Sequence, residues 1–140
     1  MSVHFHSNDI SFTLRKKLAY KKWIKEEVER RSYCLGEVNI IFCNDNYILD
    51  INRNYLQHDY FTDNITFNNN EEKLISGDLF ISVDRVKENA ATYSVTTDSE
   101  IKRVIIHGIL HLLGYNDHSP SQKTEIRKQE DAAINRFPVS

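Results

Sequence analysis

The sequence is poor in the residues that characterise several enzyme and structural classes. Its 140 residues include only four glycines, two prolines and two cysteines. So few glycines leave no phosphate-cradling loop and no Gly-x-Ser-x-Gly motif for a nucleophilic serine. No segment approaches the roughly 18 consecutive apolar residues that span a bilayer, and the N-terminus lacks a charged and then apolar signal sequence. We therefore expect a cytoplasmic protein with no membrane partner.

The cysteines and the net charge assign no chemistry by themselves. Cys34 and Cys43 are interpreted as buried thiols, the common state of isolated cysteines in a reducing cytosol. A net charge of −2 gives no overall attraction to nucleic acid, so RNA would need a local basic surface. The lysines of the first predicted helix could supply one, although a solvated helix face is the commoner use of such residues.

Hydrophobic periodicity predicts an α+β fold in one domain over residues 1–140. We expect a small mixed sheet of about four strands, packed with about five or six helices. A long apolar helix lies at the centre of this prediction and is expected to be buried on most sides. The predicted helices cover residues 14–31, 45–54, 84–93, 97–113 and 121–135, and the strands that can be located cover 37–43, 63–68 and 78–83.

Two histidines on the central helix are the strongest candidates for a metal site. His107 and His111 are four residues apart, so both imidazoles project from one helix face within reach of one ion. Gly114 can adopt positive φ and turn the chain back, so that Asn116, Asp117 or His118 meets the same metal. Three protein ligands leave an open position, where zinc-bound water has a pKa of about 7.

The alternative is that both histidines are core residues hydrogen-bonded to the backbone. Two buried imidazoles in an apolar helix are costly unless they are satisfied, and one metal ion would satisfy both. The residue after the first histidine is Gly108, whereas metallopeptidases with a His-Glu-x-x-His helix use that glutamate as general base. A metal-dependent hydrolase other than a peptidase is therefore favoured.

The metal motif resembles the signature of a known family. The YbeY family of metal-dependent endoribonucleases has a signature similar to His107-Gly-Ile-Leu-His111-Leu-Leu-Gly-Tyr115. The resemblance extends to residues 49–55, 62–67 and 77–82, in the order of the family. It implies one zinc ion per chain, cleavage of single-stranded RNA, and a role in 16S ribosomal RNA 3′-end maturation and ribosome quality control. Implied partners are the ribosomal RNA precursor and the small ribosomal subunit, with no DNA.

The sequence departs from the family at two positions. The third histidine of the family corresponds to Asp117, with His118 one residue later, so either could be the third ligand, and ungapped alignment favours Asp117. The family usually has an arginine where this chain has Leu56, and a guanidinium there would clamp a phosphate. Residues that could replace it, and the catalytic candidates beyond the metal ligands, are Arg53 and His58, with Arg85 and Lys102 as further substitutes for the clamp.

These observations favour a zinc-dependent endoribonuclease that acts on single-stranded RNA. The missing arginine keeps a second hypothesis open, namely a ribosome-assembly factor with a mainly structural metal and little nuclease activity. A structural zinc site is closed by four protein ligands, whereas the enzyme needs an exchangeable water.

Overall fold

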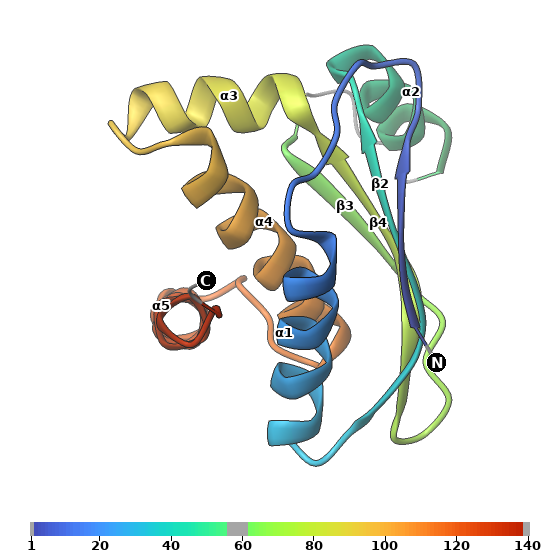
Figure 1. The fold of residues 1–140 in the computed structure, drawn as a ribbon, viewed down its shortest axis with the longest axis vertical. Coiled ribbons are helices and arrows are strands. Elements are labelled where there is room, and N and C mark those ends of the chain that lie inside the picture. The colour runs from blue at the N-terminus through green and yellow to red at the C-terminus, as the bar shows by residue number, and fades with distance from the viewer. Residues whose placement is uncertain (1, 56–61, 139–140) are drawn as a thin grey trace.

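The computed structural model describes residues 2–55 and 62–138, in which helices cover both faces of a four-stranded sheet (Figure 1). The α+β class and the mixed sheet are confirmed, and five helices lie in the described ranges. In chain order the elements are β1 (Ser2–Ser7), α1 (Lys17–Arg30), β2 (Cys34–Cys43), α2 (Asp45–Tyr55), β3 (Asn64–Asn68), β4 (Leu74–Ser82), α3 (Val83–Thr92), α4 (Thr97–Leu112) and α5 (Pro120–Asn135).

The strands are ordered β1-β2-β4-β3 across the sheet. β1 and β4 each pair in parallel with β2, and β3 pairs with β4 in the antiparallel direction. Strand β1 was not located from the sequence. Its alternation is weak because only Val3 and Phe5 face the core, while His4 and His6 lie on the outer face of the sheet. The sequence therefore predicts a fourth strand but does not locate it.

Helix boundaries differ from the predicted ones where local capping chemistry decides them. Helix α1 begins three residues later than predicted, because Lys16 adopts a left-handed conformation with φ of 60° and interrupts the helical pattern. Helix α5 begins at Pro120 rather than at 121. The hydroxyl of Ser119 accepts a hydrogen bond from the backbone N–H of Gln122, and Gln122 Oε1 accepts one from the backbone N–H of Ser119.

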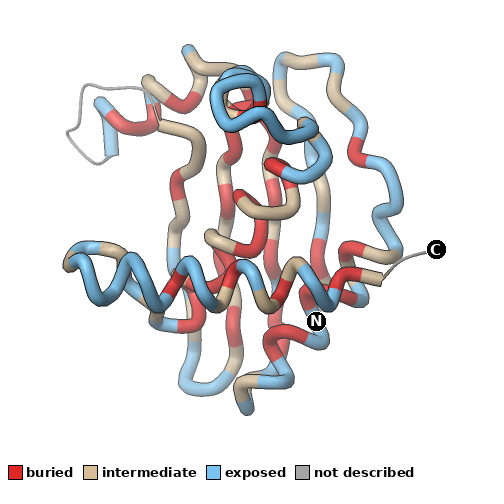
Figure 2. The backbone as a smooth tube through the Cα atoms, turned by 90° about the vertical axis from the view of Figure 1, so that its left-hand side faces the viewer, coloured by how far each residue is buried: buried red, intermediate tan, exposed pale blue. Residues whose placement is uncertain are grey.

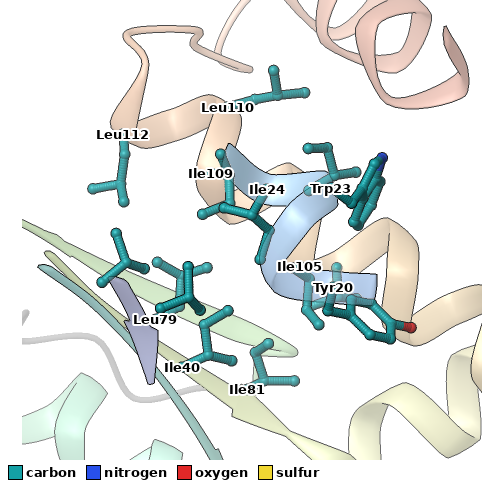
Figure 3. Packing of buried hydrophobic residues seen from close by; sticks show 14 of the residues in the cluster. Tyr20, Trp23, Ile24, Ile40, Leu79, Ile81, Ile105, Ile109, Leu110 and Leu112 are labelled. Carbon is teal, nitrogen blue, oxygen red and sulfur yellow. The ribbon is translucent and has the colours of Figure 1, made fainter. Parts of the chain in front are cut away.

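The main core lies between the sheet and the two helices α1 and α4. Figure 3 shows Ile105 and Ile109 of α4 beside Ile24 of α1, facing Leu79 and Ile40 on the strands. All five side chains are buried. Helix α4 is buried along most of its length, as its apolar sequence predicted. A smaller core lies on the opposite sheet face under α2 and consists of Cys43, Ile48, Ile51 and Ile65.

Helix α5 packs on the outer side of α4. In Figure 2 it crosses in front of the molecule with mostly exposed residues and a few buried ones. Its buried positions are Ile126, Glu130 and Ala133, and the indole N–H of Trp23 donates to the carbonyl of Ala133 at 2.8 Å. This bond fixes α5 against α1 as well. No helix among the described residues is both long enough and apolar enough to cross a membrane.

Candidate metal centre

The two histidines of α4 lie side by side near its C-terminal end. One helical turn separates them, and their Nε2 atoms are 2.9 Å apart. The side chains are 22% and 26% exposed for His107 and His111, so both rings are accessible from solvent. The alternative of two core histidines bonded only to backbone therefore does not describe this pair.

A glycine turn brings an aspartate to the same two nitrogens. Gly114 has φ of +99°, a conformation that favours glycine, and its N–H donates to the carbonyl of His111 at 3.0 Å. The chain reverses there, and Asp117 Oδ2 comes within 3.5 Å of His107 Nε2 and 3.6 Å of His111 Nε2. The turn predicted at Gly114 is therefore present.

These three side chains have the composition and spacing of a metal site. Their ligand atoms lie within 4.8 Å of one another, and no other group in the described residues meets this criterion. Two ligands bound to zinc at about 2.05 Å in a tetrahedral arrangement lie about 3.3 Å apart. The separations of 2.9, 3.5 and 3.6 Å bracket that value. The cluster of His107, His111 and Asp117 could thus bind a metal ion.

His118, the alternative third ligand, lies outside this cluster. Its side chain is exposed, and its backbone N–H donates to Gln122 Oε1 at 3.1 Å, so it forms part of the start of α5. Asp117 occupies the position facing the two imidazoles without any bulge in the chain. The geometry therefore favours Asp117, as ungapped alignment does.

Gly108 has a packing role that accounts for the absence of a glutamate beside His107. A Cβ at this position would lie 2.5 Å from Leu79 Cδ2 and 2.8 Å from Leu79 Cγ. Helix α4 therefore sits directly on β4 at this point, and a glutamate at position 108 would collide with the sheet.

Glu130 of α5 belongs to the site and was missed from the sequence. Its Oε2 lies 2.6 Å from His107 Nδ1, and its Oε1 accepts from Arg103 at 2.8 Å. Its side chain is only 5% exposed. The signal that could have found it is its position on the apolar stripe of α5 with Ile126 and Ala133, because a carboxylate on a buried face needs partners.

The two imidazoles are perturbed in opposite directions. Burial lowers the pKa of His107, but its hydrogen bond to Glu130 and the nearby carboxylate charges outweigh burial and raise that pKa above its usual value. Burial and the neighbouring His107 lower the pKa of His111. At neutral pH this favours an uncharged imidazole at His111, the state that binds a metal.

A cleft of about 720 Å³ opens beside the cluster, with His107 and Asp117 in its wall. Three basic side chains line it, from Arg103 on α4 and from Lys123 and Arg127 on α5. Tyr93, at the end of α3, lines the same cleft and is 68% exposed. These are residue types that contact phosphates and bases, and no motif in the sequence indicates a role for any of them.

Of the basic candidates proposed from the sequence, the three that the structure describes lie outside the lining of this cleft. Arg53 is in the last turn of α2, on the opposite sheet face from α4, and does not line the cleft. Arg85 is paired with Asp45 at 3.0 Å and also with a neighbouring glutamate. Lys102 lies over a phenylalanine ring at 4.6 Å. His58 and Leu56 fall outside the described residues. The catalytic roles of Arg53 and His58 stay predictions.

Comparison with known proteins identifies the family. The family model described as endoribonuclease YbeY matches residues 2–138. The chain belongs to the YbeY endoribonuclease family. This places it among nucleases, the class of hydrolases expected from its signature.

Individual members of this family match the chain over nearly their whole length. An endoribonuclease YbeY of Phocaeicola vulgatus is 49% identical over 132 residues, which cover 94% of this chain and 96% of the relative. The corresponding protein of Cytophaga hutchinsonii is 42% identical over 134 residues, covering 95% and 94%. The solution structure of TM1509 from Thermotoga maritima has the same fold, with a TM-score of 0.67 at 24% identity over 95% of this chain and 87% of that one.

Proposed function

We propose that this chain is a zinc-dependent endoribonuclease that cleaves single-stranded RNA, as one domain over residues 1–140 with one zinc ion per chain. The observation that carries the proposal is the cluster of two imidazoles and one carboxylate at the edge of a cleft whose wall also holds Lys123 and Arg127. Membership of an endoribonuclease family supplies the substrate class. The partial exposure of all three side chains supports an open, catalytic type of site.

The ligands in this proposal are His107 and His111 through Nε2 and Asp117 through a carboxylate oxygen. Zinc held by these residues would act as a Lewis acid and would lower the pKa of water to about 7. The protein holds the ligands on the rigid helix α4 and on the turn that follows it. The adjacent cleft gives a phosphodiester access to the same side of the cluster.

The cleft walls are suited to hold the RNA chain. Lys123 and Arg127 are exposed on α5, where they can contact backbone phosphates. Tyr93 offers an exposed ring on the α3 side, and unpaired bases stack on such rings while paired ones cannot. In this proposal these residues serve in place of the family arginine that Leu56 replaces.

The cellular role follows from the resemblance. We propose that the substrate is a precursor of small-subunit ribosomal RNA, that cleavage serves maturation of the 16S 3′ end and ribosome quality control, and that the protein acts in the cytoplasm. DNA is not an expected substrate. Relatives named endoribonuclease YbeY support the RNA substrate, and the more specific steps rest on the sequence signature.

The decisive experiment measures metal content and cleavage in parallel on the wild type, Asp117→Ala and His118→Ala. The wild type should carry about one zinc per chain and cleave a single-stranded ribosomal RNA precursor but not a duplex of the same sequence. Asp117→Ala should lose both properties, and His118→Ala should keep both. Loss of zinc only in His118→Ala would transfer the ligand role to that residue.

Zinc bound by the wild type without any RNA cleavage would instead favour the assembly factor. That alternative draws on the position of Arg53, Arg85 and Lys102 away from the cleft. It requires a fourth protein ligand on the metal, which an anomalous-scattering crystal structure of the zinc-loaded protein would reveal.

A further inference from the structure

The carboxylate of Glu130 contacts two different donors, one through each oxygen. Its Oε1 accepts from an N–H of Arg103 at 2.8 Å, and its Oε2 lies 2.6 Å from His107 Nδ1. The second distance is short, as is typical of hydrogen bonds to ionised groups. Glu130 thus contacts the side of the His107 ring that faces away from His111 and Asp117.

This contact determines which ring nitrogen of His107 carries the proton. An ionised carboxylate can only accept hydrogen bonds, and a neutral imidazole has one N–H. In the neutral ring the proton therefore resides on Nδ1, and Nε2 presents a lone pair toward His111 Nε2 and Asp117 Oδ2. A lone pair on Nε2 is what a metal ion requires there.

We propose that Glu130 is a positioning residue that holds His107 as its Nδ1–H tautomer and aims Nε2 at the metal. The inference rests on the proposed metal site and adds a residue to it from another helix. Carboxylates that orient metal-binding histidines in this way increase metal affinity, and their removal typically costs about 10-fold to 100-fold.

Arg103 keeps the Glu130 carboxylate in place. It lies one turn before His107 on α4, and it also donates to Asp131 of α5 at 2.8 Å. A carboxylate that is only 5% exposed needs a partner, and the guanidinium supplies one by donating to Oε1 at 2.8 Å. The same pair joins α4 to α5 beside the cluster.

Glu130→Gln tests the geometry because an amide cannot satisfy both donors. Glutamine supplies one oxygen and one NH2 group, whereas Arg103 and His107 Nδ1 both donate to this side chain. Either the arginine loses its acceptor, or the amide N–H faces His107 and drives the proton to Nε2, where it blocks the metal. The matched control is Glu125→Gln, the same change on the same helix at an exposed glutamate bonded to Gln129.

The first readout is the dissociation constant for zinc, measured by competition with a chromophoric chelator on the whole protein. We expect Glu130→Gln to raise this constant by about 10-fold to 100-fold, and Glu125→Gln to leave it within about twofold of the wild type. A folded Glu130→Gln protein that binds zinc as tightly as the wild type would overturn the inference. If the wild type binds no zinc, the proposed function fails instead.

The second readout needs neither metal nor a variant. Long-range proton–nitrogen NMR correlations on the metal-free wild type distinguish the two tautomers of a neutral imidazole, at a pH where His107 is uncharged. We expect the Nδ1–H form at His107, with a shift toward the Nε2–H form in Glu130→Gln. An Nε2–H tautomer in the wild type would refute the role of Glu130, whether or not the protein proves to be a nuclease.

Discussion

Two buried glutamates of this protein have similar surroundings and different roles. Glu27 of α1 is 1% exposed and accepts from Arg31 at 2.9 Å and from Arg136 at 2.8 Å. Glu130 of α5 is 5% exposed and shares its two oxygens between Arg103 and His107. Arginine is charged at every accessible pH and binds no metal, so the first glutamate joins helices only. Histidine can gain or lose a proton and can bind a metal ion, so the second glutamate acts on the candidate metal ligands.

Removing a metal ligand should give the largest effect on this cluster. We expect His111→Ala to abolish stoichiometric zinc binding, with an affinity loss greater than the roughly 100-fold that a supporting residue can cost. The helix and the core around it should persist, because Ile105 and Ile109 pack independently of the ring. Elemental analysis and circular dichroism check this, and full zinc occupancy in the variant would refute it.

Removing Glu27 should affect stability and leave the metal unaffected. Glu27→Ala leaves two guanidinium groups without their carboxylate, and breaking a buried ion pair costs about 3–5 kcal/mol. Urea unfolding should report this loss, while the zinc dissociation constant stays within about twofold of the wild type. The control is Glu26→Ala, a half-exposed neighbour that is 4.0 Å from Lys22, for which we expect about 0.5 kcal/mol or less. If Glu27→Ala weakened zinc binding as well as stability, the distinction between the two glutamates would be contradicted.

Acidification should separate the two sites by pH. The raised pKa of His107 in the metal-free protein means that a proton competes with zinc at a higher pH than for an ordinary imidazole near 6.5. Zinc affinity should therefore be full above that raised pKa and fall about tenfold per pH unit below it. Chelator competition between pH 5 and pH 8, estimated as the range in which histidines titrate, measures the curve. A flat curve would contradict the assignment of His107 as a ligand.

The Glu27 contribution should be lost only at lower pH. Burial raises the pKa of Glu27, but the hydrogen bonds and charges of Arg136 and Arg31 outweigh it and lower the pKa below its usual value. A lowered folded pKa stabilises the protein above the unfolded value of about 4.3, and this stability is lost as pH falls through the folded pKa. The difference in unfolding free energy between the wild type and Glu27→Gln should shrink only in that acidic range.

The smallest effect is expected at Arg127. Its guanidinium is 3.9 Å from Glu130 Oε1 and its side chain is 65% exposed, so the pair is worth about 0.2–1 kcal/mol. Arg127→Gln should therefore change zinc affinity by less than about fivefold, well below the effect of Glu130→Gln. Its effect on the KM for single-stranded RNA should be larger, because the same residue lines the cleft. If Arg127→Gln lowered zinc affinity as much as Glu130→Gln does, then Arg127, and not Arg103, would hold the carboxylate.

The parts of the site that are local in sequence were predictable. His107 and His111 are one helical turn apart, and Gly114 ends the helix three residues later, so helix geometry alone brings the pair and the following turn together. Glu130 is 23 residues from His107 on another helix. Its contact depends on how α5 packs against α4, which no local spacing encodes.

Strand β1 escaped prediction for a related reason. Its outer residues His4 and His6 bond to Glu37 and Asn39 of β2, so their polarity is satisfied by a neighbouring strand rather than by burial. Hydrophobic periodicity reports burial only, so it does not reveal polar residues that pair across neighbouring strands. The mixed α+β class was nevertheless evident, because β2, β4 and α4 carry their buried apolar residues at strand and helix spacing.

The position of α5 after α4 in the chain sets an order of events during synthesis. A growing chain that has reached Gly114 already contains both histidines, but the helix that carries Glu130 is made afterwards. Proteins form from the N-terminus onward, so the imidazoles emerge before the carboxylate that orients one of them. A chain cut short before α5 would carry the histidine motif without its support, and the full metal affinity would belong only to chains that include α5.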